Sequence, residues 1–113
     1  MIKPHGSDKL NPLFVYDTAA NEALQKEAEG FASIVVSSAA AANAVMLGAG
    51  YFNPLTGYMN KADTLSVAND MKTTSGLFWP TPVLNLVHDA GSIKAGDRIA
   101  LKDPNVEGNP VVA

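Results

Sequence analysis

The pattern of apolar and polar positions predicts a first helix close to the N-terminus. Residues 21–29 are rich in Ala, Leu, Lys and Glu, which lose little side-chain freedom in a helix. Thr18 offers an N-cap oxygen, and Gly30 is the residue expected to end this helix in a left-handed turn. The preceding residues 1–12 show no periodicity and contain two prolines. We therefore expect an extended arm there, held to the body by the apolar residues 13–15.

A second, alanine-rich helix is expected over residues 39–47. Ser37 or Ser38 can cap its start, and Gly48 and Gly50 are expected to stop it. The glycines resemble a phosphate loop only superficially, because they follow a helix instead of opening one and lack the Gly-Lys-Ser/Thr ending. We interpret them as a helix end and a sharp turn.

A third helix is indicated by the residues after Asn60. Asp63 lies three positions beyond it, close to a capping-box arrangement in which Asp replaces the usual Glu. Apolar residues then recur at helical spacing and predict one stripe facing the core. These are Ala62, Leu65, Ala68 and Met71.

Strand-like patterns account for most of the remaining chain. Residues 31–36 are apolar and β-branched and predict a buried strand, whereas 98–102 alternate as a half-buried strand does. Residues 77–87 contain two prolines, so a strand there should lie at a sheet edge or turn a barrel corner. A hairpin-like loop over 103–109 leads into the apolar residues 110–113. Because that last strand is unfinished, the sequence looks cut from a longer one.

Composition limits the chain to a single domain of a few classes. Its 113 residues match one domain, and they include no apolar run of roughly 18 residues that could span a bilayer. The absence of cysteine excludes disulfide frameworks, iron–sulfur clusters and thiol catalysis. A net charge of −3 argues against a nucleic-acid binder, which normally carries a basic patch. We expect a cytoplasmic domain.

The residue types that carry chemistry do not converge in the sequence. His5 and His88 stand far apart, and neither has a second histidine at metal-ligand spacing. His88 and Asp89 could form a base and its orienting carboxylate, although a surface histidine is the simpler interpretation. Carboxylates and cations are both scattered. Composition and spacing therefore predict a structural or accessory domain without its own active site.

Four segments, in the right order, resemble the N-terminal domain of ATP sulfurylases (sulfate adenylyltransferases). Residues 50–59, GYFNPLTGYM, with Ala62-Asp63, are similar to the family's G-x-F-S-P-L-x-G-F-M…D-Y signature. Residues 77–83 resemble its W-P-I-P-V strand, 94–101 its K-x-G-D-x-V-A-L segment, and 2–6 its opening. This chain departs from the pattern at Asn53, where Ser is usual, and at Tyr58, where Phe is common. The loop 103–110 and the stretch 12–17 look most like enzymes of sulfur-oxidising or sulfate-reducing bacteria.

The resemblance implies an α+β fold, a PUA-like mixed β-barrel with flanking helices, over residues 1–113. The family transfers an adenylyl group from ATP to sulfate, reversibly, giving adenosine 5′-phosphosulfate and pyrophosphate. Its catalytic motifs, Q-x-R-N-x-x-H-x-x-H and G-R-D-H-A-G, belong to a following domain and are absent from this sequence. We therefore predict no catalytic, cofactor-binding or metal-binding residue here. The parent enzyme would take ATP with Mg²⁺ and form a homo-oligomer, and this domain would pack on the catalytic domain.

Two other functions stay open at this stage. A free-standing PUA-like RNA-binding module is one, and a small enzyme that uses His88 and Asp89 is the other. Neither the physiological direction of the parent reaction nor the oligomeric state can be read from the residues.

Two structural expectations accompany these functional readings. Trp79 should be buried, and the turn over 52–59 should be rigid, with a positive φ at Gly57. The alternative for that turn is that Asn53 and Thr56 point outward toward a ligand.

Overall fold

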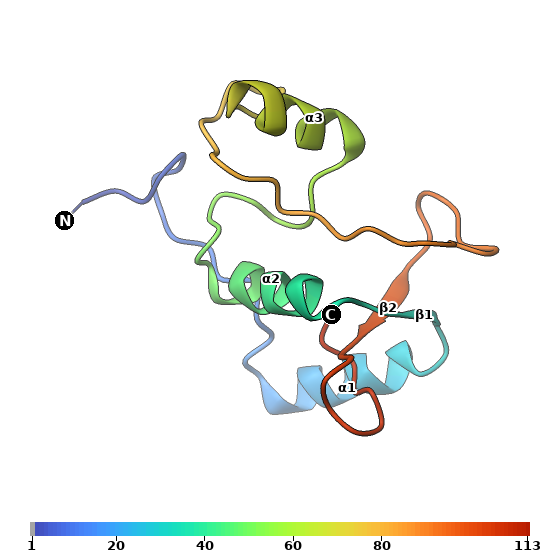
Figure 1. Cartoon of the computed structure of the whole chain (residues 1–113). Coiled ribbons are helices and arrows are strands. Elements are labelled where there is room, and N and C mark those ends of the chain that lie inside the picture. The colour runs from blue at the N-terminus through green and yellow to red at the C-terminus, as the bar shows by residue number, and fades with distance from the viewer. Residues whose placement is uncertain (1) are drawn as a thin grey trace.

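A computed structural model describes residues 2–113, and in this range the chain forms three helices and two strands (Figure 1). In chain order they are α1 (Thr18–Ala28), β1 (Ala32–Val35), α2 (Ser38–Ala49), α3 (Lys61–Asp70) and β2 (Ile99–Lys102). Figure 1 shows α3 uppermost, α2 in the middle and α1 lowest, with the strands at one side. The three predicted helices are confirmed, and so is the α+β class.

The sheet is built around β2. On one side β2 pairs in parallel with β1, in a register that sets Ala32 opposite Ile99, and the Val36 N–H continues the pairing to the Lys102 carbonyl at 3.1 Å. On its other side β2 meets the C-terminal residues, with an antiparallel bridge between Lys102 and Val111. The predicted strand at 98–102 is confirmed as β2, whereas residues 110–113 form an isolated bridge to it and no strand of their own.

β1 forms where the apolar run predicted a strand, but it is not the buried strand that we expected. Its residues are exposed except for the half-buried Ile34, and only Val36, just beyond it, is buried. The reason is that no helix or strand within the described residues covers one of the two faces of β1. Residues 2–113 likewise do not close a barrel.

Residues 77–87, which we call the crossing segment, pass beneath α3 toward β2 without forming the predicted strand (Figure 1). Its contacts with neighbours are isolated: an antiparallel bridge joins Phe78 to Lys72, and the Met59 N–H donates to the Val83 carbonyl at 2.7 Å. The two prolines at 80 and 82 lack the N–H that a ladder requires, which accounts for the interruption.

The ends of α1 differ from those predicted. Asp17, not Thr18, is the N-cap, and its carboxylate accepts from the Ala20 N–H at 2.8 Å. Gly30 is not left-handed. The helix closes through i→i+3 bonds instead, from the Gly30 N–H to the Glu27 carbonyl and from the Phe31 N–H to the Ala28 carbonyl.

α2 has the predicted N-cap, Ser37, whose hydroxyl accepts from the Ala40 N–H at 3.1 Å. Gly48 does not stop this helix but lies within it. The arm explains why a glycine is there: the Phe14 ring lies where a Cβ on Gly48 would be, and the Phe14 N–H donates to the Gly48 carbonyl at 3.0 Å. The expected anchor at 13–15 is thus confirmed in its contacts.

The core consists of two small clusters of buried side chains. The first joins α2, α3 and the crossing segment through Leu47, Val67, Trp79 and Val83. The second lies between α2 and the sheet and contains Val36, Ala40 and Ala41. The predicted burial of Trp79 is confirmed.

The apolar stripe predicted for α3 is wrong. Leu65 is 52 % exposed and Met71 51 %, whereas Val67 is buried. α3 ends at Met71, which takes a left-handed conformation (φ 53°) so that its N–H can reach the Val67 carbonyl. α3 therefore packs on the core through one large apolar residue, Val67, and Leu65 lies on its outer face.

Gly50, not Gly57, is the glycine on which the conformation after α2 depends. Gly50 has a φ of 83°, and a Cβ there would lie 3.4 Å from the backbone of Pro12. Gly57 is not among the positive-φ glycines, which contradicts our expectation, and a Cβ there would meet nothing within 4 Å.

We therefore expect Gly50→Ala to lower the free energy of unfolding by about 1–2 kcal/mol, because an L-residue is strained at that φ. Gly57→Ala is the matched control and should change it by less than about 0.5 kcal/mol. Urea denaturation of both variants measures the difference. Equal destabilisation by the two substitutions would contradict this assignment.

Candidate functional site

The turn after α2 carries the segment that resembles the family signature, and its Asn53 side chain is buried. Asn53 is 8 % exposed. Its amide oxygen accepts from the Asn11 N–H at 3.1 Å, and its amide nitrogen donates to the Ser7 hydroxyl at 2.6 Å. Asn53 therefore binds the N-terminal arm to the turn. Thr56 is exposed. Because Asn53 is buried, the alternative in which both side chains point outward toward a ligand is contradicted for Asn53.

Both ends of the turn are attached to the body. The Tyr58 hydroxyl donates to the Ala40 carbonyl of α2, and burial raises the pKa of this phenol above its ordinary value. Phe52 packs edge-to-face on Trp79, with ring centroids 5.9 Å apart. The peptide bond between Asn53 and Pro54 is cis. These contacts support the structural interpretation of the turn.

Asp63, the acidic residue of the signature, caps a neighbouring loop. Its Oδ1 accepts from both the backbone N–H and the hydroxyl of Thr74, at 2.8 and 2.7 Å. These hydrogen bonds hold the pKa of the Asp63 carboxyl below its ordinary value. The carboxylate is thus occupied within its own loop.

The two histidines do not meet in the structure. His5 donates from Nε2 to the Phe78 carbonyl at 2.7 Å and lies 6.1 Å from the Trp79 ring, so it fastens the arm to the crossing segment. His88 and Asp89 are both exposed, and Asp89 accepts from the Gly91 N–H, which closes a turn. Asp89 therefore does not orient His88, and the proposed pair of base and carboxylate gains no support.

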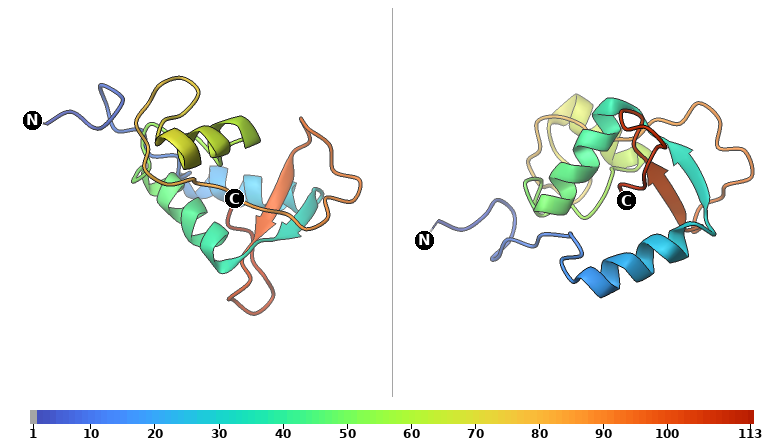
Figure 2. Two further views of the ribbon diagram at one scale, coloured as in Figure 1. Left: turned by 45° about the horizontal axis from the view of Figure 1, so that its top comes forward. Right: turned by 90° about the horizontal axis from the view of Figure 1, so that it is seen from below.

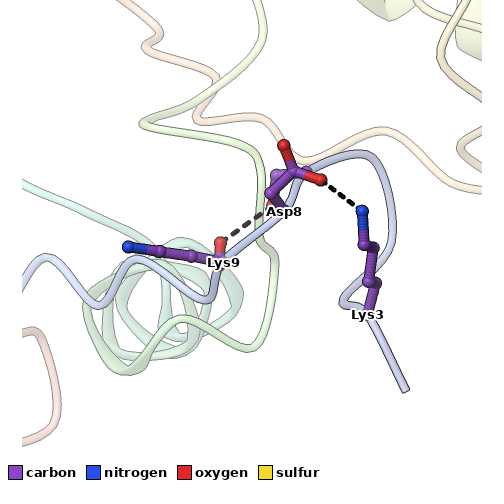
Figure 3. Close-up of polar contacts among 4 residues, drawn as sticks. Lys3, Asp8 and Lys9 are labelled. Atoms are coloured by element: carbon purple, nitrogen blue, oxygen red, sulfur yellow. Dashed lines mark hydrogen bonds and ion pairs between the residues drawn. The ribbon is translucent and has the colours of Figure 1, made fainter. Parts of the chain in front are cut away.

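The charged groups of the arm pair locally. Figure 3 shows the ion pair between the Lys3 ammonium and Asp8, whose atoms are 2.8 Å apart. Close by, the Ser7 hydroxyl donates to the Lys9 carbonyl. Both members of the ion pair are exposed, and such pairs contribute about 0–1 kcal/mol. Within residues 2–113, no three His, Asp or Glu side chains gather in the way that a metal ion needs. None of the helices in this range is long and apolar enough to cross a membrane.

An apolar groove of about 580 Å³ lies between α1, α2 and β2. Figure 2 shows α1 set apart from α2, with the C-terminus between α2 and β2. We call this apolar groove the α1 groove. Its lining includes Phe14, Leu24, Phe31, Leu101 and Val112.

One cation lies at this groove, and it is already engaged. Arg98 pairs with Glu27 at 2.8 Å and lies over the Phe31 ring, 4.9 Å from the centroid. The α1 groove therefore offers an apolar surface, and the charge of Arg98 in its wall is already paired. Such a surface suits a polypeptide better than it suits a phosphate or sulfate ion. Sequence reasoning missed the groove. The available signal was Leu24, the one large apolar residue in the predicted first helix.

A smaller hollow, about 310 Å³, lies between the turn and residues 73–77. Its hydroxyl groups are satisfied within the protein: those of Thr73 and Ser75 are 2.8 Å apart, and Thr73 also accepts from the Leu77 N–H. This arrangement stabilises the loop and leaves no group poised for chemistry.

Comparison with known proteins relates the chain to one part of longer proteins. The chain is 62 % identical over its whole length to a sulfate adenylyltransferase of Alcanivorax borkumensis and 59 % identical to one of Allochromatium vinosum. In each case it spans only 28 % of the relative. Among solved structures it is similar to a chain described as hexameric APS kinase from Thiobacillus denitrificans. There the TM-score is 0.78 at 29 % identity, over 98 % of this chain and 22 % of that one.

A family model described as a PUA-like domain matches residues 2–113, nearly the entire chain. That match agrees with the three helices and the sheet centred on β2. The chain therefore belongs to the PUA-like domain family.

Proposed function

We propose that this chain is the N-terminal, non-catalytic domain of a sulfate adenylyltransferase, which converts ATP and sulfate to adenosine 5′-phosphosulfate and pyrophosphate. The observation that carries the proposal is the full-length match, at 62 % and 59 % identity, to two proteins of that name. Because the chain spans about a quarter of those relatives, the remaining three quarters would hold the catalytic groups.

The internal chemistry of the domain supports an accessory role. Adenylyl transfer needs positioned cations, because the triphosphate and the sulfate are both anionic. Here Lys3 is paired with Asp8 and Arg98 with Glu27, on opposite parts of the molecule. ATP with Mg²⁺ would accordingly bind outside this domain. In the longer protein, we infer, further strands close the PUA-like barrel around β2.

The partners follow from the same proposal. The domain would pack on the catalytic domain of its own chain, in a cytoplasmic homo-oligomer, and the hexameric neighbour supports the oligomer. A separate RNA-binding module is not favoured, because the relatives are named for adenylyl transfer and the eight cations are dispersed among eleven carboxylates.

The proposal is tested by comparing the 113-residue chain with the full-length protein that contains it. We expect the full-length protein to form pyrophosphate from ATP and sulfate, and the folded 113-residue chain to form none. His88→Ala in the full-length protein should leave turnover within about twofold, since an exposed side chain without a catalytic role contributes little to the transition state.

Each contrary outcome removes a definite part of the proposal. A full-length protein without ATP- and sulfate-dependent turnover would overturn the assigned reaction. Turnover by the 113-residue chain, free of contaminating enzyme, would overturn the accessory role. If His88→Ala made in the 113-residue chain abolished that turnover, the stand-alone enzyme would be established instead.

A further inference from the structure

The smaller hollow, of about 310 Å³ between the turn and residues 73–77, carries a negative charge and no cation. We call it the turn hollow. Asp63 is half-buried in its lining, and the hydrogen bonds from Thr74 hold the pKa of the Asp63 carboxyl below its ordinary value, so the group is ionised at neutral pH. Among the described residues that line the turn hollow, none is a lysine or an arginine. The charge of Asp63 is therefore not neutralised within these walls.

The lining of the turn hollow offers acceptors more than donors. Both bonds from Thr74 end on Oδ1 of Asp63, so Oδ2 takes part in neither. The Asp63 N–H is already used, since it donates to the Asn60 amide oxygen at 2.8 Å. The Leu77 N–H is used as well, because it donates to the hydroxyl of Thr73. A carboxylate oxygen beside hydroxyl groups requires a donor, and a cationic donor binds it most strongly.

Gly57 keeps the wall of the turn hollow clear of side-chain atoms. Its φ is not positive, and a Cβ there would meet nothing within 4 Å. The fold of residues 2–113 thus gives no reason for a glycine at this position. Glycine also serves where another group must approach the backbone closely. The neighbouring Thr56 is exposed and adds a hydroxyl to the same wall, so the opening suits an approaching polar side chain.

The apolar part of the lining fits the stem of a long cationic side chain. Pro54, Leu55 and Leu77 belong to it. Lysine and arginine bury their methylene groups along such surface while the charged end meets a polar partner. A volume of about 310 Å³ is at the lower end of the range of small-molecule sites, about 300–1,000 Å³, and suits a single side chain. Arginine fits better than lysine, because its planar group has five donors that can bind a carboxylate and a hydroxyl together.

We propose that the turn hollow receives one arginine side chain of the catalytic domain, whose guanidinium donates to Asp63 and whose stem packs on Leu55 and Leu77. This inference rests on the proposed function, because the catalytic domain supplies the arginine. Residues 1–113 contain a single arginine, Arg98, and that one is paired with Glu27 at 2.8 Å. The new pair would fix how the two domains are oriented, since complementary charges set register more than affinity.

Arginine modification in the full-length protein tests the proposal. p-Hydroxyphenylglyoxal reacts with accessible guanidinium groups, and mass spectrometry of the digested protein gives the rate at each arginine. Asp63→Asn removes the charge but retains an amide oxygen that can accept from Thr74. Thr74→Val is the matched control, because it removes the hydroxyl bond to Asp63 and leaves the carboxylate in place. Arg98, outside the lining of the turn hollow, is the internal reference.

We expect one arginine outside residues 1–113 to react slowly in the unsubstituted protein. Asp63→Asn should accelerate its modification at least about tenfold, because a guanidinium without its carboxylate leaves the hollow more often. Thr74→Val should change that rate by less than about twofold, and Arg98 should react alike in all three proteins. The proposal is overturned if no arginine outside residues 1–113 responds to Asp63→Asn, or if Thr74→Val accelerates the same arginine equally.

A cross-link identifies the source of the arginine. p-Benzoylphenylalanine in place of Thr56, an exposed residue of the same wall, captures what lies over the turn hollow. We expect the cross-linked peptide to contain or adjoin the arginine that responds to Asp63→Asn, in a product with the mass of one chain. A product with the mass of two chains would place the arginine on a second copy and overturn its assignment to the protein's own catalytic domain.

These outcomes are separable from that of the proposed function. A protein that is active on ATP and sulfate, but whose arginines do not respond to Asp63→Asn, would remove the inference about the turn hollow alone. An inactive protein with the expected arginine response and cross-link would remove the assigned reaction alone.

Discussion

Replacing Trp79 with alanine is expected to lower the free energy of unfolding by about 3–5 kcal/mol. The indole is 9 % exposed and joins Leu47, Val67 and Val83 in the larger cluster. Phe52 packs edge-to-face on it, so truncation also removes an aromatic pair. Small domains have about 5–15 kcal/mol in total, so Trp79→Ala should leave the chain close to unfolding at 37 °C. Urea denaturation followed by circular dichroism measures the loss.

Phe78→Ala provides the matched control for Trp79→Ala. Phe78 is the adjacent aromatic residue and is 53 % exposed, and its carbonyl, which binds His5, survives the substitution. Its truncation should cost less than about 1.5 kcal/mol. If the two variants unfold at the same urea concentration, Trp79 is not the centre of the core.

Asn53→Ala is expected to release the N-terminal arm at a cost of about 1–3 kcal/mol, because it removes two hydrogen bonds of a buried amide. The arm contains Lys3 and Lys9, so trypsin reports its release directly. A loss of about 1–3 kcal/mol corresponds to roughly 5–160-fold more of the open form, and cleavage after Lys9 should accelerate by that factor.

Thr56→Ala, in the same turn but exposed, should leave the rate of cleavage after Lys9 unchanged. Equal protection of the arm in Asn53→Ala would show that His5 and its bond to Phe78 hold the arm without help from the turn.

Local signals in the sequence predicted the helices well. Caps and helix formers act over a few residues, so Asn60 and one of the two candidate serines, Ser37, are the N-caps, each accepting from an N–H three residues ahead. Thr18 was displaced by its neighbour because Asp17 offers a stronger acceptor to the same first turn. The burial of Trp79 was also predicted, because it lies among apolar residues and a proline in a segment expected to face the core.

The parts that were missed depend on contacts between distant segments. Val67 packs in one cluster with Trp79 and Val83 of the crossing segment, and this contact determines which face of α3 is buried. Helical periodicity alone cannot show which apolar residues of the helix make such contacts. Gly48 is required by the Phe14 ring, far away in sequence, and not by its own turn. The α1 groove could not be predicted from the sequence for the same reason, because α1, α2 and the C-terminal segment form its walls together.

The parallel pairing of β1 with β2 has a consequence for how the chain folds during synthesis. Glu27 and Arg98, which flank the two strands, are 71 residues apart, so β1 leaves the ribosome long before its partner. At about 5–20 residues per second, the edge of β1 waits roughly 4–14 s for β2. During that time α2, α3 and the segment with Trp79 and Val83 can form their common cluster, while an apolar strand edge stays open to other nascent chains. The sheet therefore closes last, and chaperone binding to the nascent chain should centre on the segment around Ile34.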